Sequence, residues 1–341
     1  MTSATTPRFA RQLALAAGLL LPLGAGASYA EREEGRAFIQ EMVERHGFDA
    51  GELGAALARA NHDPEVIRLI TPPSKRGVRS WRNYRARFLD PVRIRGGVAF
   101  WDEHAALLER ASERFGVPPE IIVAIIGVET VYGRHTGNFE TMSTLATLAF
   151  DYPRRAELFR GELEALFLMA REQRRDPASY YGSYAGALGY PQFLPSSLRA
   201  YAVDFDGNGE IDFESDPYDA IGSVANYLHV HGWQPGAPIA ERARFTGVVD
   251  PAPLVAAGIE PALHPEALAS IGVTTIGGGA PASTATLVDL ESPNATTEYW
   301  LGYRNFYVIT RYNRSSFYAM SVFELAEAIR RQRERLVATG R

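Results

Sequence analysis

An almost uninterrupted apolar stretch that ends in an acid constrains this chain more than any other feature. Residues 121–133 read IIVAIIGVETVYG, and Pro118 and Pro119 precede them. Proline is favoured in the first turn of a helix, so we predict a helix from Glu120 to Val131. A helix that is apolar on all sides has to be buried, and the fold must therefore build a core around it.

Glu129 lies near the C-terminal end of this predicted helix. Buried carboxylates without a partner are rare, because removing the charge from water costs free energy. Burial raises the pKa of a carboxyl group, and the negative end of the helix dipole acts in the same direction. A glutamate that stays protonated near neutral pH is what a general acid requires. The alternative is a structural glutamate paired with a nearby arginine, and this helix alone does not decide between the two.

Composition narrows the class of protein. The 341 residues are enough for two or three domains, and 46% hydrophobic with 22% charged residues is typical of globular proteins. A net charge of −5 argues against a nucleic-acid binder. The chain has no cysteine, which excludes disulfides, thiolate nucleophiles and cysteine-zinc sites.

The N-terminus has the pattern of an export signal. Arg8 and Arg11 precede an apolar run over 13–23, and small residues follow up to Ala30. We predict a signal peptide over 1–30 that is cleaved near Ala30. The run is too short to span about 30 Å of hydrocarbon, and there is no cysteine for lipid attachment. We therefore expect a periplasmic protein without a stable membrane anchor.

Helical periodicity covers most of the remaining chain. The predicted helices lie at about 31–70, 97–115, 144–150, 156–171, 195–202, 220–228 and 321–336. Between 236 and 302 the chain is rich in Gly, Pro, Thr and Val, with strand-like runs at Thr286–Leu290 and Glu298–Tyr303. We also expect Asn305–Tyr312 to be extended. The fold class is therefore α+β, mostly α.

Four segments resemble the lytic murein transglycosylase B family, here in a soluble form that is not a lipoprotein. They are GVETVYG at 127–133, FDYPRR at 150–155, YAGALGYPQFLPSS at 184–197 and DAIGSVANYL at 219–228. The resemblance covers essentially the whole mature chain and implies a lysozyme-like core. Together with the patterns above, it suggests a signal peptide (1–30), a helical domain (31–110), the catalytic core with an EF-hand-like loop (111–235), a small β-rich inserted domain (236–302) and a C-terminal return to the core (303–341).

The resemblance implies a lytic transglycosylase that cleaves the MurNAc-GlcNAc β-1,4 bond of peptidoglycan. Glu129 would protonate the glycosidic oxygen, and the substrate's own 2-acetamido group would stabilise the anomeric carbon. Glu129 would then take the proton from the muramic O6 hydroxyl, which closes a 1,6-anhydro ring without water. Most glycosidases use two carboxylates, but no second one is placed by the sequence. We expect the nearest, Asp151, to cap or orient local backbone, and we expect no cofactor for catalysis.

The resemblance also assigns the groove that binds the glycan strand. Gln192 and Ser183 would hydrogen-bond the sugars, and Phe193 would pack on a ring face. The remaining groove lining would be Tyr84, Tyr227, Tyr312, Asn313 and Tyr318. Arg154 and Arg155 could reach different oxygens of a stem-peptide carboxylate, although a solvated charge pair at a helix start is the alternative.

A second motif predicts a structural Ca²⁺ site. Residues 204–212, DFDGNGEID, match the start of an EF-hand loop, D-x-[DN]-x-[DN]-G. The oxygen ligands would be Asp204, Asp206, Asn208 and the backbone carbonyl of Glu210. Ser215 stands where the closing glutamate is usual. The resemblance supplies Asp219 instead, and Asp212, Glu214 and Asp216 are the other candidates. The alternative to a cation site is a mere acidic turn.

Other functions remain open at this point. The chain could be a hydrolytic lysozyme-like muramidase, which adds water at the anomeric carbon, or a non-catalytic peptidoglycan-binding scaffold. Glycan strands and stem peptides are the expected partners, nucleic acid is not, and other cell-wall enzymes are left open.

Overall fold

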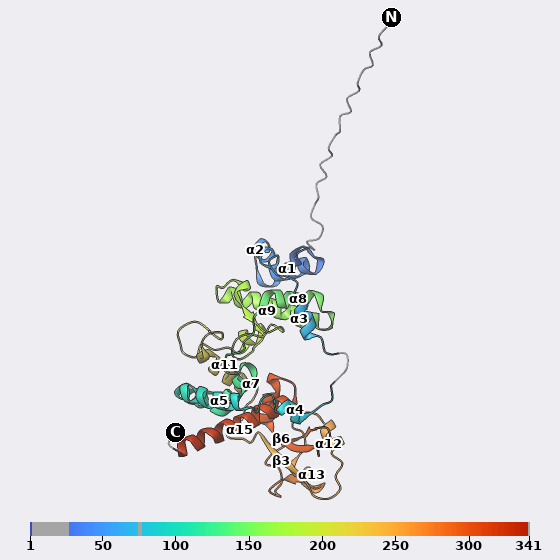
Figure 1. The fold of residues 1–341 in the computed structure, drawn as a ribbon, viewed down its shortest axis with the longest axis vertical. Coiled ribbons are helices and arrows are strands. Elements are labelled where there is room, and N and C mark those ends of the chain that lie inside the picture. The colour runs from blue at the N-terminus through green and yellow to red at the C-terminus, as the bar shows by residue number, and fades with distance from the viewer. Residues whose placement is uncertain (2–26, 74–76, 340–341) are drawn as a thin grey trace.

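The computed structural model describes residues 1, 27–73 and 77–339. It is a mostly helical α+β fold, as predicted, with two small antiparallel sheets. Helices α1 (Glu33–His46) and α2 (Ala50–Leu57) lie at one end, and the larger sheet lies at the other (Figure 1). Most of the predicted signal peptide falls outside the described residues. None of the helices in the described part of the chain is long and apolar enough to cross a membrane.

The N-terminal helices rest on α8 (Thr141–Asp151) and α9 (Ala156–Glu172). The short helix η1 (Tyr29–Glu31) leads into α1, and α3 (Pro64–Ile70) lies against α8. Polar side chains of α8 fix the chain between α2 and α3. The Asn61 amide donates to Ser143 Oγ (2.9 Å), and the Asp63 amide donates to Thr147 Oγ1 (3.0 Å).

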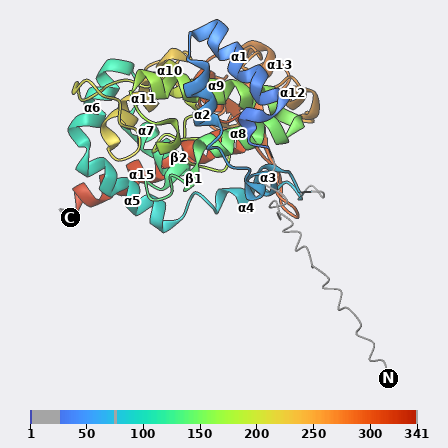
Figure 2. The same ribbon diagram turned by 90° about the horizontal axis from the view of Figure 1, so that it is seen from above.

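The apolar helix is α7 (Pro119–Thr130), and the core is built around it as predicted. Residues 121–126 are each at most 1% exposed. Helices α5 (Pro91–Glu103), α6 (Ala105–Phe115), α11 (Pro217–Val230) and α15 (Ser316–Ala338) surround it. The long α15 runs beside α5 and α7 (Figure 2).

The region 31–110, expected to form one helical domain, divides between two parts of the molecule. Whereas α3 contacts α8 and Phe38 of α1 packs against Phe150 of α8 (ring centroids 6.2 Å apart), helices α4 (Trp81–Arg85) and α5 contact α15. Pro72 and Pro73 follow the end of α3, and proline cannot continue a helix. The chain then crosses to the far end, where the Trp81 amide donates to the Glu291 carbonyl (2.6 Å).

The larger sheet has the strand order β4-β3-β6-β5 and is antiparallel throughout. Its strands are β3 (Ala240–Phe245), β4 (Val273–Thr275), β5 (Thr286–Leu290) and β6 (Glu298–Gly302). Helices α12 (Ala252–Ala256) and α13 (Pro265–Ser270) belong to the same region. It has a small core of its own that includes Leu268, Leu287 and Leu301. The strand-like runs are thus real, but the insertion also holds helices.

The prediction of an extended run over Asn305–Tyr312 is wrong, because this segment is helix α14 (Arg304–Tyr312). Aromatic and β-branched residues favour strands, but that preference depends on packing. Here Asn305, Phe306 and Ile309 recur at helical spacing and are all buried. The remaining short elements are η2 (Pro153–Arg155), η3 (Pro177–Ser179), β1 (Phe139–Glu140), β2 (Tyr181–Gly182) and α10 (Pro195–Tyr201).

Candidate active site

Glu129 is the penultimate residue of α7 and is half-buried. The chain turns away directly after it, because Val131 and Tyr132 both have a left-handed backbone (φ 52° and 61°). Such values are costly for a residue with a branched side chain such as Val131. Thr130 Oγ1 accepts a hydrogen bond from the Gly133 amide (3.0 Å), which satisfies the turn. The last helical turn therefore presents Glu129 at the edge of the core.

Tyr132 holds this turn in place from behind. Its hydroxyl donates to the Arg93 carbonyl on α5 (2.7 Å). Its ring occupies a slot formed by Gly96, Gly97 and Gly127, where side chains are not tolerated. A Cβ on Gly127 would lie 2.5 Å from the Tyr132 hydroxyl oxygen, and one on Gly97 would lie 2.6 Å from it. We did not predict this slot, although Gly127 and Tyr132 both stand in the GVETVYG motif.

The surroundings of Glu129 are aromatic. Tyr318, on α15, is 2% exposed and donates a hydrogen bond to Glu129 Oε1 (2.6 Å). Tyr312 stacks on Tyr318 with ring centroids 6.4 Å apart. Burial raises the pKa of both tyrosines, as it does for Tyr84, and the charge of Glu129 adds to each shift. All three rings therefore lie near the acid.

Burial raises the pKa of Glu129 to about 7, while the hydrogen bond from Tyr318 lowers it. Among the described residues, none forms an ion pair with Glu129. The alternative of a structural glutamate paired with arginine therefore finds no support here. A half-buried glutamate with this pKa can both give and accept a proton near neutral pH.

The loop that carries Ser183 and Gln192 lies against the end of α7. Thr130 Oγ1 is 3.2 Å from the Tyr190 carbonyl. Gln192 has a left-handed backbone (φ 50°), and its side-chain amide donates to the carbonyls of Thr136 and Gly189 (3.0 Å each). No described residue donates a hydrogen bond to its Oε1, which can therefore accept one from a ligand. Ser183 Oγ accepts from the Ala187 amide (3.1 Å), so that hydroxyl also shapes the loop.

The other predicted groove residues form an aromatic wall. Phe193 is 3% exposed and packs between Tyr227 (5.2 Å) and Tyr312 (5.4 Å). The Tyr227 and Tyr312 hydroxyls donate to the carbonyls of Arg311 and Pro191 (2.7 Å each). In this structure the Phe193 ring supports the tyrosines rather than facing solvent. Asn313 is exposed, directly after α14.

Arg154 and Arg155 lie on η2 and are exposed. The Arg155 guanidinium sits over the Phe159 ring (5.3 Å). No hydrogen bond or ion pair joins Arg154 to another described residue, so its charge is available to a ligand. The expectation for Asp151 is corrected: its carboxylate binds the side chains of Tyr29, Arg32 and His62, not local backbone. These three partners occupy it, because the N-terminal segment packs on the end of α8.

Comparison with known proteins decides the family. The family model of the transglycosylase SLT domain matches residues 30–327. The chain belongs to the lytic murein transglycosylase B family. It is 43% identical over 313 residues to the membrane-bound lytic murein transglycosylase B of Escherichia coli (strain K12), which covers 89% of this chain and 84% of the relative.

Solved structures of family members agree with the fold. The catenated lytic transglycosylase SltB1 of Pseudomonas aeruginosa is 45% identical, with a TM-score of 0.84 over 89% of this chain and 99% of that one. The E. coli Slt35 structure with calcium is 43% identical (TM-score 0.79, 90% and 96% covered). SltB3 of P. aeruginosa with NAG-anhNAM-pentapeptide is 32% identical (TM-score 0.76, 89% and 80% covered).

This family member has a cluster of three carboxylates in the predicted cation loop. Oxygens of Asp204, Asp206 and Asp219 all lie within 4.8 Å of one another. Asp219 is 2% exposed and accepts from the amides of Phe205 (2.6 Å) and Asp212 (2.8 Å). None of the three forms an ion pair with a described residue. Converging carboxylates without a cationic side chain are what a hard divalent ion requires.

The other candidates for the closing ligand are engaged elsewhere. Asp212 accepts from the amides of Glu214 and Ser215 (2.9 Å each). Glu214 pairs with Arg175 (2.8 Å), and Asp216 caps α11. Asp219 is therefore the candidate that the fold brings to the first two ligands. Asn208 and Glu210 lie in the same loop, where the Glu210 amide donates to Asn208 Oδ1 (2.8 Å).

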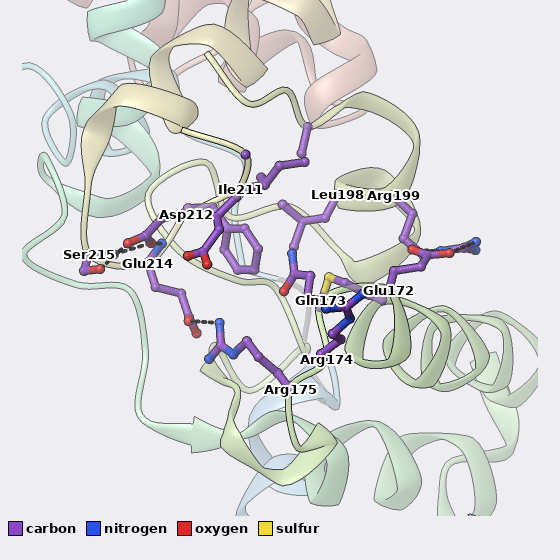
Figure 3. A pocket seen from close by; sticks show the side chains of 15 residues that line it. Glu172, Gln173, Arg174, Arg175, Leu198, Arg199, Ile211, Asp212, Glu214 and Ser215 are labelled. Carbon is purple, nitrogen blue, oxygen red and sulfur yellow. Dashed lines mark hydrogen bonds and ion pairs between the residues drawn. The ribbon is translucent and has the colours of Figure 1, made fainter. Parts of the chain in front are cut away.

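The predicted cation loop contacts the back of the loop that carries Ser183 and Gln192. The Tyr190 amide donates to the Phe213 carbonyl (2.8 Å). Gly189, with φ 63°, packs so closely on that carbonyl that a Cβ would overlap it. Beyond Phe213, a cavity of about 880 Å³ opens between α9, α10 and residues 209–215 (Figure 3). Two ion pairs lie in its walls, Arg199 with Glu172 (2.7 Å) and Arg175 with Glu214 (2.8 Å), and Glu129 does not line it.

Proposed function

We propose that this lytic transglycosylase cuts the MurNAc-GlcNAc β-1,4 bond of peptidoglycan with Glu129 as its single acid and base, and leaves 1,6-anhydro-MurNAc ends. The observation that carries the proposal is the state of Glu129. Burial holds its pKa at about 7, Tyr318 orients one of its oxygens, and no ion pair to a described residue neutralises it. Catalytic acids are most effective when their pKa lies near the working pH.

In the proposed reaction Glu129 gives up one proton and takes one back, so that it ends in its starting form. Protonated Glu129 donates to the glycosidic oxygen, and the bond from that oxygen to C1 of MurNAc breaks. The substrate's 2-acetamido group stabilises the positive C1. The Glu129 carboxylate then takes the proton of the MurNAc O6 hydroxyl, and O6 bonds to C1. Because Tyr318 occupies Oε1, we assign both proton transfers to Oε2.

The residues around the acid supply the glycan site. Gln192 Oε1 accepts from sugar hydroxyl or acetamide groups, and Ser183 lies on the same loop. Tyr84, Tyr227, Tyr312 and Tyr318, backed by Phe193, form the apolar wall, with Asn313 at its rim. Arg154 and Arg155 bind stem-peptide carboxylates. The SltB3 complex with NAG-anhNAM-pentapeptide supports a substrate of this class.

We further propose a structural Ca²⁺ held by Asp204, Asp206, Asn208, the Glu210 carbonyl and Asp219. The convergent carboxylates support it, as does the calcium complex of Slt35. The ion would stabilise the loop and take no part in the chemistry. We also propose that the enzyme acts in the periplasm, a location supported by a peptidoglycan substrate and by the predicted signal peptide.

Mass spectrometry of products from purified peptidoglycan tests the proposal. The wild-type enzyme should release muropeptides lighter by one water than hydrolytic products, and Glu129→Gln should release none. Hydrated products would instead identify a lysozyme-like muramidase. Binding of glycan strands without any cleavage by the wild-type chain would identify a scaffold.

A further inference from the structure

Tyr29 belongs to the core although it lies within the predicted signal peptide. It is 4% exposed, and its ring centroid lies 5.4 Å from that of Phe150. Its hydroxyl donates to Asp151 Oδ2 (2.5 Å). Arg32 covers the ring at 5.0 Å and also binds Asp151 (2.8 Å). The tyrosine therefore joins the segment before α1 to the end of α8.

Ser28 is also part of the fold. Its amide and its hydroxyl both lie close to Glu31 Oε2 (2.9 and 3.1 Å), and the Glu31 amide donates to the Ser28 carbonyl (2.9 Å). This reciprocal arrangement begins η1. The turn packs tightly, since a Cβ on Gly35 would overlap the Tyr29 carbonyl. Ala27, one residue earlier, is exposed.

Two alanines that follow the apolar run satisfy the small-x-small rule of signal peptide cleavage as the last residue before the cut. One is Ala30, in Ser28-Tyr29-Ala30, and the other is Ala27, in Ala25-Gly26-Ala27. A cut after Ala30 would remove a buried aromatic side chain and the cap of η1. It would also take one of the three side-chain partners from Asp151. A cut after Ala27 leaves all of these contacts in place.

We infer that the signal peptide is removed between Ala27 and Ser28, three residues earlier than the sequence alone predicted, so that the mature protein begins with Ser28. Water splits the peptide bond, which leaves a carboxylate on Ala27 and an α-amino group on Ser28. That nitrogen lies 2.9 Å from Glu31 Oε2. Processing therefore turns an amide–carboxylate hydrogen bond into an ammonium–carboxylate pair, which is the stronger contact.

Intact-mass measurement and N-terminal sequencing of the full chain, exported in a Gram-negative host, test this inference. We expect a chain of residues 28–341. A chain that starts at Glu31, or one that keeps its leader, would overturn it. Neither readout depends on peptidoglycan cleavage, so the result is independent of the proposed activity.

A pair of matched variants locates the cleaved bond from the extent of processing, which does not depend on how stable either variant is. Ala27→Leu places a large residue directly before the inferred bond, and we expect uncleaved precursor to accumulate at least fivefold. The matched Ala30→Leu variant should be processed like the wild type, still with Ser28 first. The reverse pattern would assign the cut to Ala30.

A second measurement tests the reason for the position. Chains that begin at Ser28 and at Glu31, made without a leader, should differ in thermal stability, with the shorter chain melting several degrees lower. Equal melting temperatures would show that Tyr29 does not anchor the fold and would remove the basis of the inference.

Discussion

The Tyr318 hydroxyl donates a 2.6 Å hydrogen bond to Glu129 Oε1 across 189 positions of the sequence. This bond favours the charged form of the glutamate, whereas burial favours the neutral form. The two effects oppose each other and leave the pKa of Glu129 at about 7. The tyrosine thus adjusts the acid as well as orienting it.

Tyr318→Phe should move the basic limb of the pH–rate profile upward. The variant removes the one hydrogen bond that lowers the pKa of Glu129, and a bond to a charged group contributes roughly 1.5–3 kcal/mol. Since 1.36 kcal/mol equals one pKa unit, we expect a shift of about one unit or more. Release of anhydro-muropeptides measured between pH 5 and 9 checks this. If the basic limb has the same pKa in the variant and in the wild type, the Tyr318 hydroxyl does not lower the pKa of Glu129.

Glu129→Gln should stabilise the protein at alkaline pH while it abolishes cleavage. The pKa of Glu129 is raised from 4.5 to about 7 on folding, so the folded state binds more protons between these values. The contribution of protonated Glu129 to the free energy of unfolding is therefore fully present below about pH 4.5, and it is lost as the pH rises through 7. We expect the variant to be more stable by roughly 1–3 kcal/mol at pH 8, and equal at pH 4.

Denaturant unfolding at the two pH values measures the difference. Glu113→Gln, at an exposed position of α6, is the control and should show no such dependence on pH. The difference in free energy of unfolding between the wild type and Glu129→Gln could be the same at pH 4 and pH 8. That result would mean that ionisation of Glu129 does not destabilise the folded protein.

Ca²⁺ should raise the melting temperature of the wild-type enzyme, and Asp206→Asn should weaken its binding by about tenfold or more. The variant removes one of three converging charges, and a ligand that binds the folded state stabilises it by mass action. Glu210→Gln is a matched control on the same loop, because Glu210 is expected to offer only its backbone carbonyl. Titration calorimetry and thermal unfolding give both readouts. Equal loss of binding in the two variants would contradict the ligand assignment.

Gly127→Ala should destabilise the enzyme by about 1–3 kcal/mol, because the added methyl group overpacks the Tyr132 slot. In a Tyr132→Ala background the same change should cost far less, and the double-mutant cycle isolates this coupling. Gly161→Ala is the control: Gly161 lies in α9 with nothing near its Cβ position. It should stabilise the helix by about 0.5–1 kcal/mol. Additive effects of Gly127→Ala and Tyr132→Ala in urea unfolding would refute the slot.

Local patterns in the sequence predicted much of this protein. The apolar run predicted helix α7, and its one acidic residue near the C-terminal end, Glu129, was the candidate for the general acid. The spacing of oxygen-bearing residues located the carboxylates at Asp204 and Asp206, and a strand-like run bounded by turn residues located β5. The sequence signal for each of these features lies within about a dozen neighbouring residues, and over that range periodicity and spacing predict structure.

Contacts between distant segments could not be predicted in the same way. The residues of α14 have strand propensity, and the burial of Asn305, Phe306 and Ile309 at helical spacing stabilises the helix instead. Asp151 was expected to serve local backbone, yet its partner Tyr29 lies 122 positions earlier. The slot for Tyr132 needs glycines on both α5 and α7. Such pairings depend on which elements meet, and this is a property of the whole fold.

The position of Tyr318 also has a consequence for the order in which the enzyme is made. It stands on α15, the last helix of the chain, whereas Glu129 precedes it by more than half of the polypeptide. Chains emerge from the ribosome N-terminus first. The acid therefore meets its hydroxyl partner only when synthesis is nearly finished, and a prematurely terminated chain would carry the acid without it.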